Sequence, residues 1–358
     1  MTTEDSDLPL VTVVMPIRNE QRWIGRSIAA VLSQDYPADR LEVLVADGMS
    51  DDGTRHIVQE IARRDPRVRL LDNTARIMVT GFNKALLLSH GDVIVMLGGH
   101  AELSPDYVRT CADVLQLKTA DCVGGSLETV CETKKAAAIS LAMSSPFGVG
   151  NAMFRIGAKQ KTYVDTVAFG AYTREIIERA GLLDEELVRN QDDEYNYRLR
   201  KLGARILLVP DIRCRYHSRT SLSSLWRQYF WYGYWKVRVM QKHPRQMGIR
   251  QFVPPTFVAT LLVLAATALF FPFSRVLLGI VAGAYILVNG AASVLTARAG
   301  GWRNLPLLPF AFITLHLSYG SGFLLGLAKF WNRWGEIRIY KTMQTSDPKF
   351  VNVAVSRN

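Results

Sequence analysis

Residues 41–54 read LEVLVADGMSDDGT. The apolar run from Leu41 to Ala46 has the length and composition of a buried strand, and an acidic turn containing glycine follows it. Thr54 then begins a stretch with helical periodicity that continues to Ala62. A strand that leads through a polar turn directly into a helix is the repeating unit of α/β sheets.

The same alternation extends on both sides of this segment, from Leu10 to about Pro210. Further strands are predicted at Leu10 to Met15, Val68 to Leu71 and Val93 to Leu97, and further helices at Trp23 to Leu32 and Thr80 to Leu88. We therefore predict an open, mostly parallel α/β sheet. No G-x-G-x-x-G follows the first strand and no P-loop motif occurs, so the usual dinucleotide and ATP fingerprints are absent.

Polar segments follow three of these predicted strands, at residues 16–20, 47–54 and 98–102. Ligands of such sheets bind beyond the carboxyl ends of the strands. Each segment alone is also consistent with ordinary turn chemistry, because Asp-Asp-Gly-Thr is a good helix cap. Together they predict a polar ligand-binding cleft.

The C-terminal third has a different composition. Between Ile212 and Gly335 there is no Asp or Glu but there are 14 Lys and Arg, whereas the rest of the chain carries 29 basic and 32 acidic residues. The same third contains three apolar stretches, Phe252 to Phe273, Val276 to Thr296 and Leu305 to Leu327. Each has about the 20 residues needed to cross a bilayer, and the alternative is buried helices of a soluble domain. Basic residues that flank apolar stretches indicate an anionic membrane surface, so we expect no nucleic-acid partner.

The first two stretches are joined by a short link and are expected to form a hairpin, whereas the third spans, kinks or re-enters. We expect no signal peptide before the first domain, and the basic residues around Arg250 and Arg298 predict that the soluble domain lies in the cytoplasm. The four cysteines form no C-x-x-C pair, which suits a reducing compartment. We expect a multi-pass protein of the inner (plasma) membrane, with two or three crossings left open.

Residues 220–242 mix seven aromatic side chains with four cationic ones, which predicts an amphipathic helix in the headgroup layer; an aromatic core helix is the alternative. The expected organisation is a cytoplasmic domain at 1–215, an interface-helix region at 216–250, transmembrane helices at 251–330 and a basic tail at 331–358.

A series of short motifs occurs at residues 13–20, 45–54, 81–85, 145–151, 169–172, 181–185, 191–199 and 226–233. The series resembles family 2 glycosyltransferases, which have the GT-A nucleotide-sugar-binding fold, and in particular the membrane-attached succinoglycan-biosynthesis type. Each motif alone is unspecific, but the combination is specific. The resemblance implies inverting transfer of a sugar from a nucleotide sugar, usually a UDP-sugar.

The resemblance also implies a set of donor-binding residues: Pro16, Asn19, Glu20, Asp47, Asn83, Gly98, Arg227 and Gln228. Asp47 is expected to accept a hydrogen bond from the uracil N–H, and Glu20 with Asn19 to hold the ribose or base. Arg227 and Gln228 resemble the element that closes over the diphosphate, with lipid-headgroup contact as the alternative.

A divalent cation, Mn²⁺ or Mg²⁺, normally neutralises the diphosphate in this family and is bound by a D-x-D motif. This sequence departs from that pattern, because Gly98 and His100 occupy the two aspartate positions and Glu102 lies two residues further on. We expect His100, with Glu102, to contact the metal; a histidine that merely lies in a turn is the alternative.

Inversion needs one base to deprotonate the acceptor hydroxyl. Asp192, Asp193 and Glu194 open a predicted helix, where acids also serve as partners of the helix dipole. The family's Glu-Asp element matches Gln191-Asp192, so Asp192 is the expected base and Asp193 the second choice. Residues expected on the acceptor side are Phe147, Gly148, Gly150, Asn151 and Asp193.

The sequence therefore predicts a membrane-attached, metal-dependent inverting hexosyltransferase. Its acceptor is expected to be a lipid-linked (polyprenyl) sugar in exopolysaccharide or cell-envelope glycan synthesis. Transfer to polyprenyl phosphate itself is one alternative, and processive polysaccharide synthesis, which the short membrane part disfavours, is another. The missing aspartates leave a non-catalytic nucleotide-sugar-binding subunit as a third.

Overall fold

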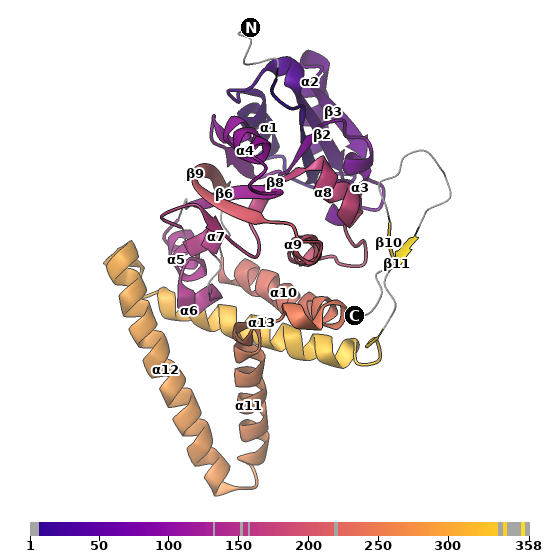
Figure 1. Ribbon diagram of the computed structural model, residues 1–358. Helices are drawn as coiled ribbons and strands as arrows, with labels where there is room; N and C mark the ends of the chain where they lie inside the picture. Colours follow the sequence, from indigo (N-terminus) through magenta and orange to yellow (C-terminus); the bar gives the residue numbers. More distant parts are fainter. Residues whose placement is uncertain are drawn as a thin grey trace. The chain divides into compact units, whose positions relative to one another are not determined.

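The computed structural model describes residues 7–131, 133–150, 153–156, 158–217, 221–335, 339–341 and 352–354 (Figure 1). The chain divides into two compact units. The first unit comprises residues 1–128, 157–217 and 337–358, and the second comprises residues 129–156 and 218–336. Asn151 and most of the tail predicted at 331–358 lie outside the described residues.

The first unit alternates strands and helices, as the sequence predicts. Its strands are β1 (Val11–Ile17), β2 (Leu41–Asp47), β3 (Val68–Asp72), β4 (Val93–Met96), β5 (Ala101–Leu103), β6 (Cys122–Val130), β7 (Thr162–Tyr163), β8 (Ala168–Thr173) and β9 (Ile206–His217). Its helices are α1 (Ile24–Leu32), α2 (Thr54–Arg64), α3 (Met78–Leu87), α4 (Tyr107–Gln116), α8 (Arg174–Ala180) and α9 (Gln191–Lys201). Two short strands, β10 (Ile339–Lys341) and β11 (Asn352–Ala354), pair separately.

The strands of the first unit form one mixed sheet in the order β3-β2-β1-β4-β8-β6-β9-β5, and β7 pairs with β9. The four strands predicted from the sequence, β1 to β4, are its parallel half. The other half is antiparallel where β8 meets β4 and β6, and where β9 meets β5 and β7. The two central parallel strands are buried at every residue, β1 as VTVVMPI and β4 as VIVM, because helices cover both faces of such a sheet. The edge strand β3 (VRLLD) is only partly buried.

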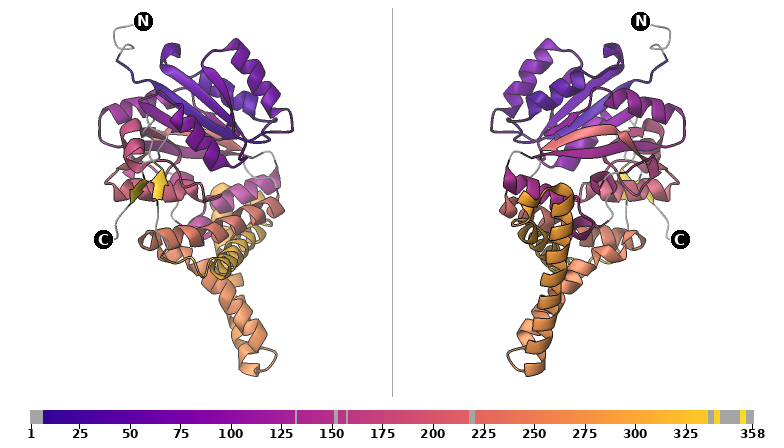
Figure 2. Two further views of the ribbon diagram at one scale, coloured as in Figure 1. Left: turned by 90° about the vertical axis from the view of Figure 1, so that its right-hand side faces the viewer. Right: turned by 90° about the vertical axis from the view of Figure 1, so that its left-hand side faces the viewer.

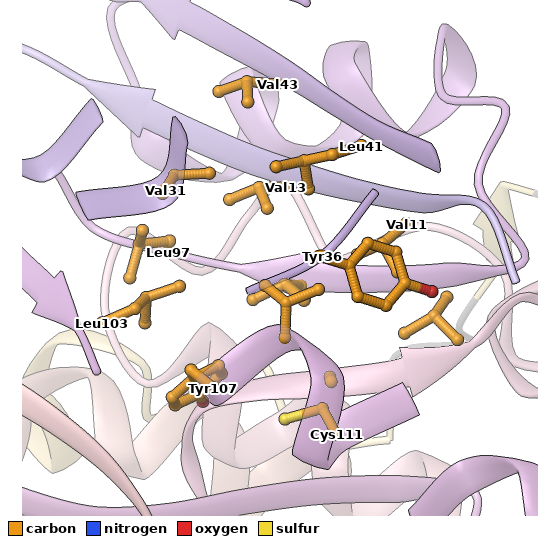
Figure 3. Close-up of a cluster of buried hydrophobic side chains, with 14 of the residues drawn as sticks. Val11, Val13, Val31, Tyr36, Leu41, Val43, Leu97, Leu103, Tyr107 and Cys111 are labelled. Atoms are coloured by element: carbon orange, nitrogen blue, oxygen red, sulfur yellow. The ribbon is translucent and has the colours of Figure 1, made fainter. Parts of the chain in front are cut away.

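The core of the first unit lies between β1, β2 and the helices that face them (Figure 3). Val11, Val13 and Val43 have no exposed surface, and Tyr107 and Cys111 from α4 reach the same cluster. This packing fixes the strands, and therefore fixes the positions from which their polar carboxyl ends emerge.

The second unit is helical. It contains α5 (Lys134–Met143), α6 (Pro146–Val149), α7 (Met153–Ile156), α10 (Leu222–Lys242), α11 (Val253–Thr267), α12 (Pro272–Gly300) and α13 (Leu308–Lys329). Three of its helical segments, 249–267, 272–300 and 308–329, are long and apolar enough to cross a membrane. Helices α11 and α12 form the expected hairpin, joined at one end by a short link (Figure 1), and both project from the rest of the second unit in the views of Figure 2.

Helix α13 differs from this hairpin because it packs closely along α10. A Cβ atom on Gly322 would lie 1.9 Å from the carbonyl oxygen of Phe230, and one on Gly326 would lie 2.6 Å from that of Tyr234. The two helices can therefore touch backbone to backbone only because α13 carries glycine at these positions. Further along, the guanidinium of Arg238 donates to Gln241 and to the carbonyl of Arg333.

Candidate active site

Two polar segments meet at the point where the winding of the sheet reverses. The chain passes from β1 to β2 on one side, whereas β4 pairs with the other side of β1. Ligands of α/β sheets bind at such a switch point. Here Glu20, just beyond β1, and His100, just beyond β4, lie 2.8 Å apart from Oε1 to Nδ1. The sequence named both residues but did not predict that they pair.

The segments after β1 and β2 are cross-linked by hydrogen bonds. The side-chain amide of Asn19 donates to Asp51, and its carbonyl oxygen accepts from the Asp51 backbone, at 2.8 and 3.1 Å. Ser50 accepts from the Asn19 backbone, and Thr54 accepts from that of Glu20. Asn19 adopts a positive φ of 55°, a conformation that asparagine tolerates better than most residues. A shallow pocket lies over this segment, lined by Asn19, Glu20, Gln21, Arg22, Trp23 and Asp52.

Asp47 is fully buried at the end of β2, and nearby groups engage both of its carboxylate oxygens. The backbone and hydroxyl of Ser50 donate to it, and the guanidinium of Arg55 lies 3.2 Å away. A hydrogen bond with Asp72 raises the pKa of Arg55, and the one with Asp47 acts in the same direction. Asp47 therefore organises the turn after β2, and the predicted contact with a base requires this turn to open.

The side chain of Asn83, on α3, is also fully used inside the protein. Its amide donates to the carbonyl of Leu183 and to Glu185, and its oxygen accepts from the Leu183 backbone. Asn83 thus holds the loop that leads from α8 towards α9. Pro16 is buried in β1 and packs near Gly81 of α3.

The segment after β4 leaves little room for side chains. A Cβ atom on Gly99 would lie 2.9 Å from Cγ of Glu20, so glycine allows the Glu20 side chain to reach His100. One on Gly98 would lie 3.3 Å from the ring of Phe169. Glu102, on β5, forms an ion pair with Arg26 at 3.0 Å. Among the described residues, no three His, Cys, Asp or Glu side chains gather as a ligand set.

Asp192 lies in the first turn of α9 and is exposed, while Asp193 is partly exposed and Glu194 is fully buried. Acidic side chains in the first turn of a helix lie beside the positive end of its dipole. The helix is held in place by Arg198, which pairs with Glu194 at 3.0 Å and donates to the carbonyls of Ala180 and Leu182. An accessible carboxylate is thereby presented from a fixed helix end.

The remaining predicted residues belong to the second unit. On α10, Arg227 is exposed, and the amide of the half-buried Gln228 donates to Tyr232. Phe147 and Gly148 lie on α6, and Gly150, with a φ of 68°, ends that helix. The cationic side chains of α10 differ from the expectation, because Lys236, Arg238 and Lys242 are buried and only Arg227 is exposed.

Comparison with known families addresses the N-terminal half of the chain. Residues 12–181 match the family model described as glycosyl transferase family 2. This segment is a family 2 glycosyltransferase domain. The match runs from β1 into the loop that follows α8, and it includes Glu20, Asp47 and His100.

Similarity to curated relatives extends beyond this domain and through the C-terminal helices. The protein is 29% identical over 330 residues to the succinoglycan biosynthesis protein ExoA of Rhizobium meliloti, covering 90% of this chain and 96% of that one. It is 27% identical over 328 residues to a Methanococcus voltae enzyme, covering 89% and 97% of the two chains. That enzyme is named dolichyl N-acetyl-α-D-glucosaminyl phosphate 3-β-D-2,3-diacetamido-2,3-dideoxy-β-D-glucuronosyltransferase.

The fold is that of the GT-A glycosyltransferases. A mannosyltransferase from Pyrobaculum calidifontis, solved in complex with GDP-mannose and Mn²⁺, superposes with a TM-score of 0.57. The two sequences are 20% identical, and the match covers 88% of each chain.

Sequence reasoning did not assign a role to two aromatic residues beside His100 or to one arginine beside Asp47. Tyr216 of β9 places its ring 5.1 Å from that of His100, and Phe169 lies 6.2 Å from Tyr216. Arg55 reaches Asp47 and Asp72 from α2. Tyr216 comes to His100 through the antiparallel pairing of β5 with β9, which no local pattern indicates.

Proposed function

We propose that this protein is a membrane-attached inverting glycosyltransferase that moves a hexose from a UDP-sugar to a lipid-linked acceptor in exopolysaccharide or cell-envelope glycan synthesis. The observation that carries the proposal is the polar cluster of Glu20 and His100 at the switch point of a family 2 domain. Similarity over nearly the whole chain to a succinoglycan protein and to a transferase whose name specifies a dolichyl-linked sugar phosphate supports the acceptor class.

In the proposed mechanism Asp192 accepts the proton of the acceptor hydroxyl as that oxygen attacks the anomeric carbon. Its exposure at the first turn of α9 suits a carboxylate that an acceptor hydroxyl must reach. Asn19 and Glu20 bind the donor from the segment after β1. Arg227, exposed on α10, supplies positive charge for the diphosphate, and Gln228 assists it.

His100 fits a divalent cation as a single protein contact, because a cation that binds a diphosphate needs only one or two protein ligands. Glu102 fits less well, since its carboxylate is paired with Arg26. When bound, Mn²⁺ or Mg²⁺ neutralises charge on the leaving diphosphate. The Mn²⁺ in the mannosyltransferase complex is consistent with this assignment.

We further propose that the chain crosses the inner membrane twice, with its catalytic domain in the cytoplasm. Helix α13 runs along α10, and α10 carries Lys236, Arg238 and Lys242, which no lipid core accepts cheaply. If α13 crossed the membrane, α10 would also have to enter it, because the two helices pack against each other along their length. Within its most apolar 18 residues, α13 has 44% of the residues buried inside the protein, whereas each hairpin helix has 11%. We place α10 and α13 at the membrane surface, where exposed tryptophans such as Trp331 and Trp334 suit the interface.

The topology is testable by labelling engineered cysteines with a membrane-impermeant maleimide, in a Cys131→Ser background. Phe271→Cys reports the hairpin tip, and Trp331→Cys reports the end of α13. We expect Trp331→Cys to react only in inside-out vesicles and Phe271→Cys only in right-side-out ones. If Trp331→Cys instead reacted in the same vesicles as Phe271→Cys, the chain would cross the membrane three times.

The function itself is tested by incubating the purified full-length protein with a panel of nucleotide sugars. Parallel reactions receive a membrane lipid extract, free polyprenyl phosphate or no lipid. Sugar transfer that requires the lipid-linked sugars of the extract is the expected result. Transfer to free polyprenyl phosphate would instead favour a monosaccharide-phosphate product, and binding of UDP without any turnover would indicate a non-catalytic subunit.

A further inference from the structure

A stripe of polar residues runs along one face of α12. Tyr285, Asn289, Ser293 and Thr296 are spaced by four, four and three residues, so they share a face of the helix. The stripe lies within an otherwise apolar helix, and Asn289 and Ser293 are buried. Buried polar groups in such a helix need partners and usually mark a function.

Members of the stripe bind α13 and the loop at residues 145–150. The amide of Asn289 donates to the carbonyl of Pro309 at 3.1 Å, and the Tyr285 hydroxyl lies 2.9 Å from Nδ1 of His316. The hydroxyl of Thr296 lies 3.5 Å from that of Ser145, the residue that caps α6. The stripe therefore reaches the loop directly at one end and through His316 at the other.

His316 completes the second connection. Its Nε2 lies 2.9 Å from the backbone carbonyl of Phe147, and their rings meet edge to face at 4.8 Å. A carbonyl only accepts hydrogen bonds, so Nε2 carries the proton, and in the neutral ring Nδ1 then accepts from Tyr285. Only 9% of His316 is exposed. The imidazole thus joins α6 to α12 with both of its nitrogens used.

The loop that His316 holds is the segment assigned above to the acceptor side. We propose that His316 is a positioning residue, which fixes the loop of residues 145–150 on the membrane hairpin so that this loop binds the lipid-linked acceptor. The inference rests on the proposed function for the identity of the acceptor. The anchoring itself rests only on contacts within the second unit. Loss of His316 should therefore weaken acceptor binding and leave donor binding unchanged.

The first test measures anchoring without any reaction. Amide hydrogen exchange is followed for residues 148–150, whose backbone N–H groups bond within the loop to Ser145 and Pro146. We expect faster exchange in His316→Ala. Exchange in His316→Gln should stay near the wild-type rate, because the glutamine side chain can replace the donor and the acceptor that the two ring nitrogens of His316 provide. Ser318→Ala is the matched control, since Ser318 is buried on the same helix but bonds only to α13. Equal exchange in all four proteins overturns the proposal.

The second test separates the acceptor from the donor. With a polyprenyl-diphosphate monosaccharide as the probe acceptor, His316→Ala should raise its KM about tenfold, the effect of one net hydrogen bond. The donor KM should stay within twofold, and His316→Gln should recover most of the loss. An equal rise in both KM values, or none, overturns the proposal. If the wild type transfers no sugar to any lipid, the proposed function fails, and the exchange measurement alone decides whether His316 anchors the loop.

Discussion

Arg198 is predicted to contribute more to the stability of the catalytic domain than any exposed arginine of α9. Its guanidinium pairs with Glu194 and donates to the carbonyls of Ala180 and Leu182, and it lies 4.9 Å from the ring centre of Tyr195. The two charged side chains are 6% and 0% exposed, so solvent screens their interaction little. Arg198→Ala leaves the Glu194 carboxylate buried without this partner and removes the donors to both carbonyls.

The expected magnitude follows from this burial. Breaking a buried ion pair by removing one partner costs about 3–5 kcal/mol. In a domain of about 200 residues each kcal/mol lowers Tm by about 2–4 °C, so Arg198→Ala should lower Tm by roughly 6–20 °C. The matched control is Arg200→Ala on the same helix, whose pair with Asp165 is 37% and 72% exposed. An exposed pair contributes about 0–1 kcal/mol, so this variant should shift Tm by less than about 4 °C.

The assay is scanning calorimetry of the full-length protein in detergent. Calorimetry is preferable to tryptophan fluorescence, because six of the seven tryptophans belong to the second unit. In the double variant Glu194→Leu/Arg198→Met no charge is left buried, and part of the lost stability should return. A Tm for Arg198→Ala equal to that of Arg200→Ala would show that the buried pair of Arg198 and Glu194 contributes no more to stability than the exposed pair of Arg200 and Asp165.

Two further predictions concern other sites. Burial raises the pKa of the Cys111, Cys122 and Cys214 thiols. At pH 8 the native protein should therefore react with Ellman's reagent only at the exposed Cys131, whereas the unfolded protein should react at all four cysteines. More than one fast-reacting thiol in the native protein would contradict this prediction. His100→Ala should raise the Mn²⁺ concentration for half-maximal transfer about tenfold or more, whereas His100→Asp should keep it near the wild-type value; an unchanged Mn²⁺ requirement in His100→Ala would remove His100 from the metal site.

The parallel half of the sheet was predictable because its strands are buried runs with helical stretches between them. Strand β2 was predicted at Leu41 to Ala46 and extends only one residue further, to Asp47. The antiparallel half was not predicted. Strands β5 and β7 have only three and two residues, and the longer β6 (CVGGSLETV) and β9 (ILLVPDIRCRYH) interrupt their apolar residues with glycine, proline or charged side chains. Local patterns locate continuous buried apolar runs, whereas the pairing partner of a strand such as β9 is selected by tertiary packing.

The candidate site shows the same division. The polar segments after the strands indicated Glu20, Asp47 and His100 as site residues. The contact between Glu20 and His100 was not predictable, because it depends on the pairing of β1 with β4. The sequence also could not distinguish a ligand from a structural residue. Asn83 is of a residue type that often binds ligands, yet its side-chain amide already donates hydrogen bonds to the carbonyl of Leu183 and to Glu185. In contrast, the polar stripe on α12 has a periodicity that a helical projection of the sequence displays.

The role of Asp192 is the central claim, and one comparison tests it directly. UDP binding and sugar transfer are measured for the purified wild type, Asp192→Asn and Asp193→Asn under the same conditions. We predict that Asp192→Asn binds UDP nearly as well as the wild type while its transfer rate falls about 10²- to 10⁴-fold, the range for a lost general base. Near-normal transfer by Asp192→Asn, above all with an inactive Asp193→Asn, would show that Asp192 is not the base and would assign that role to Asp193.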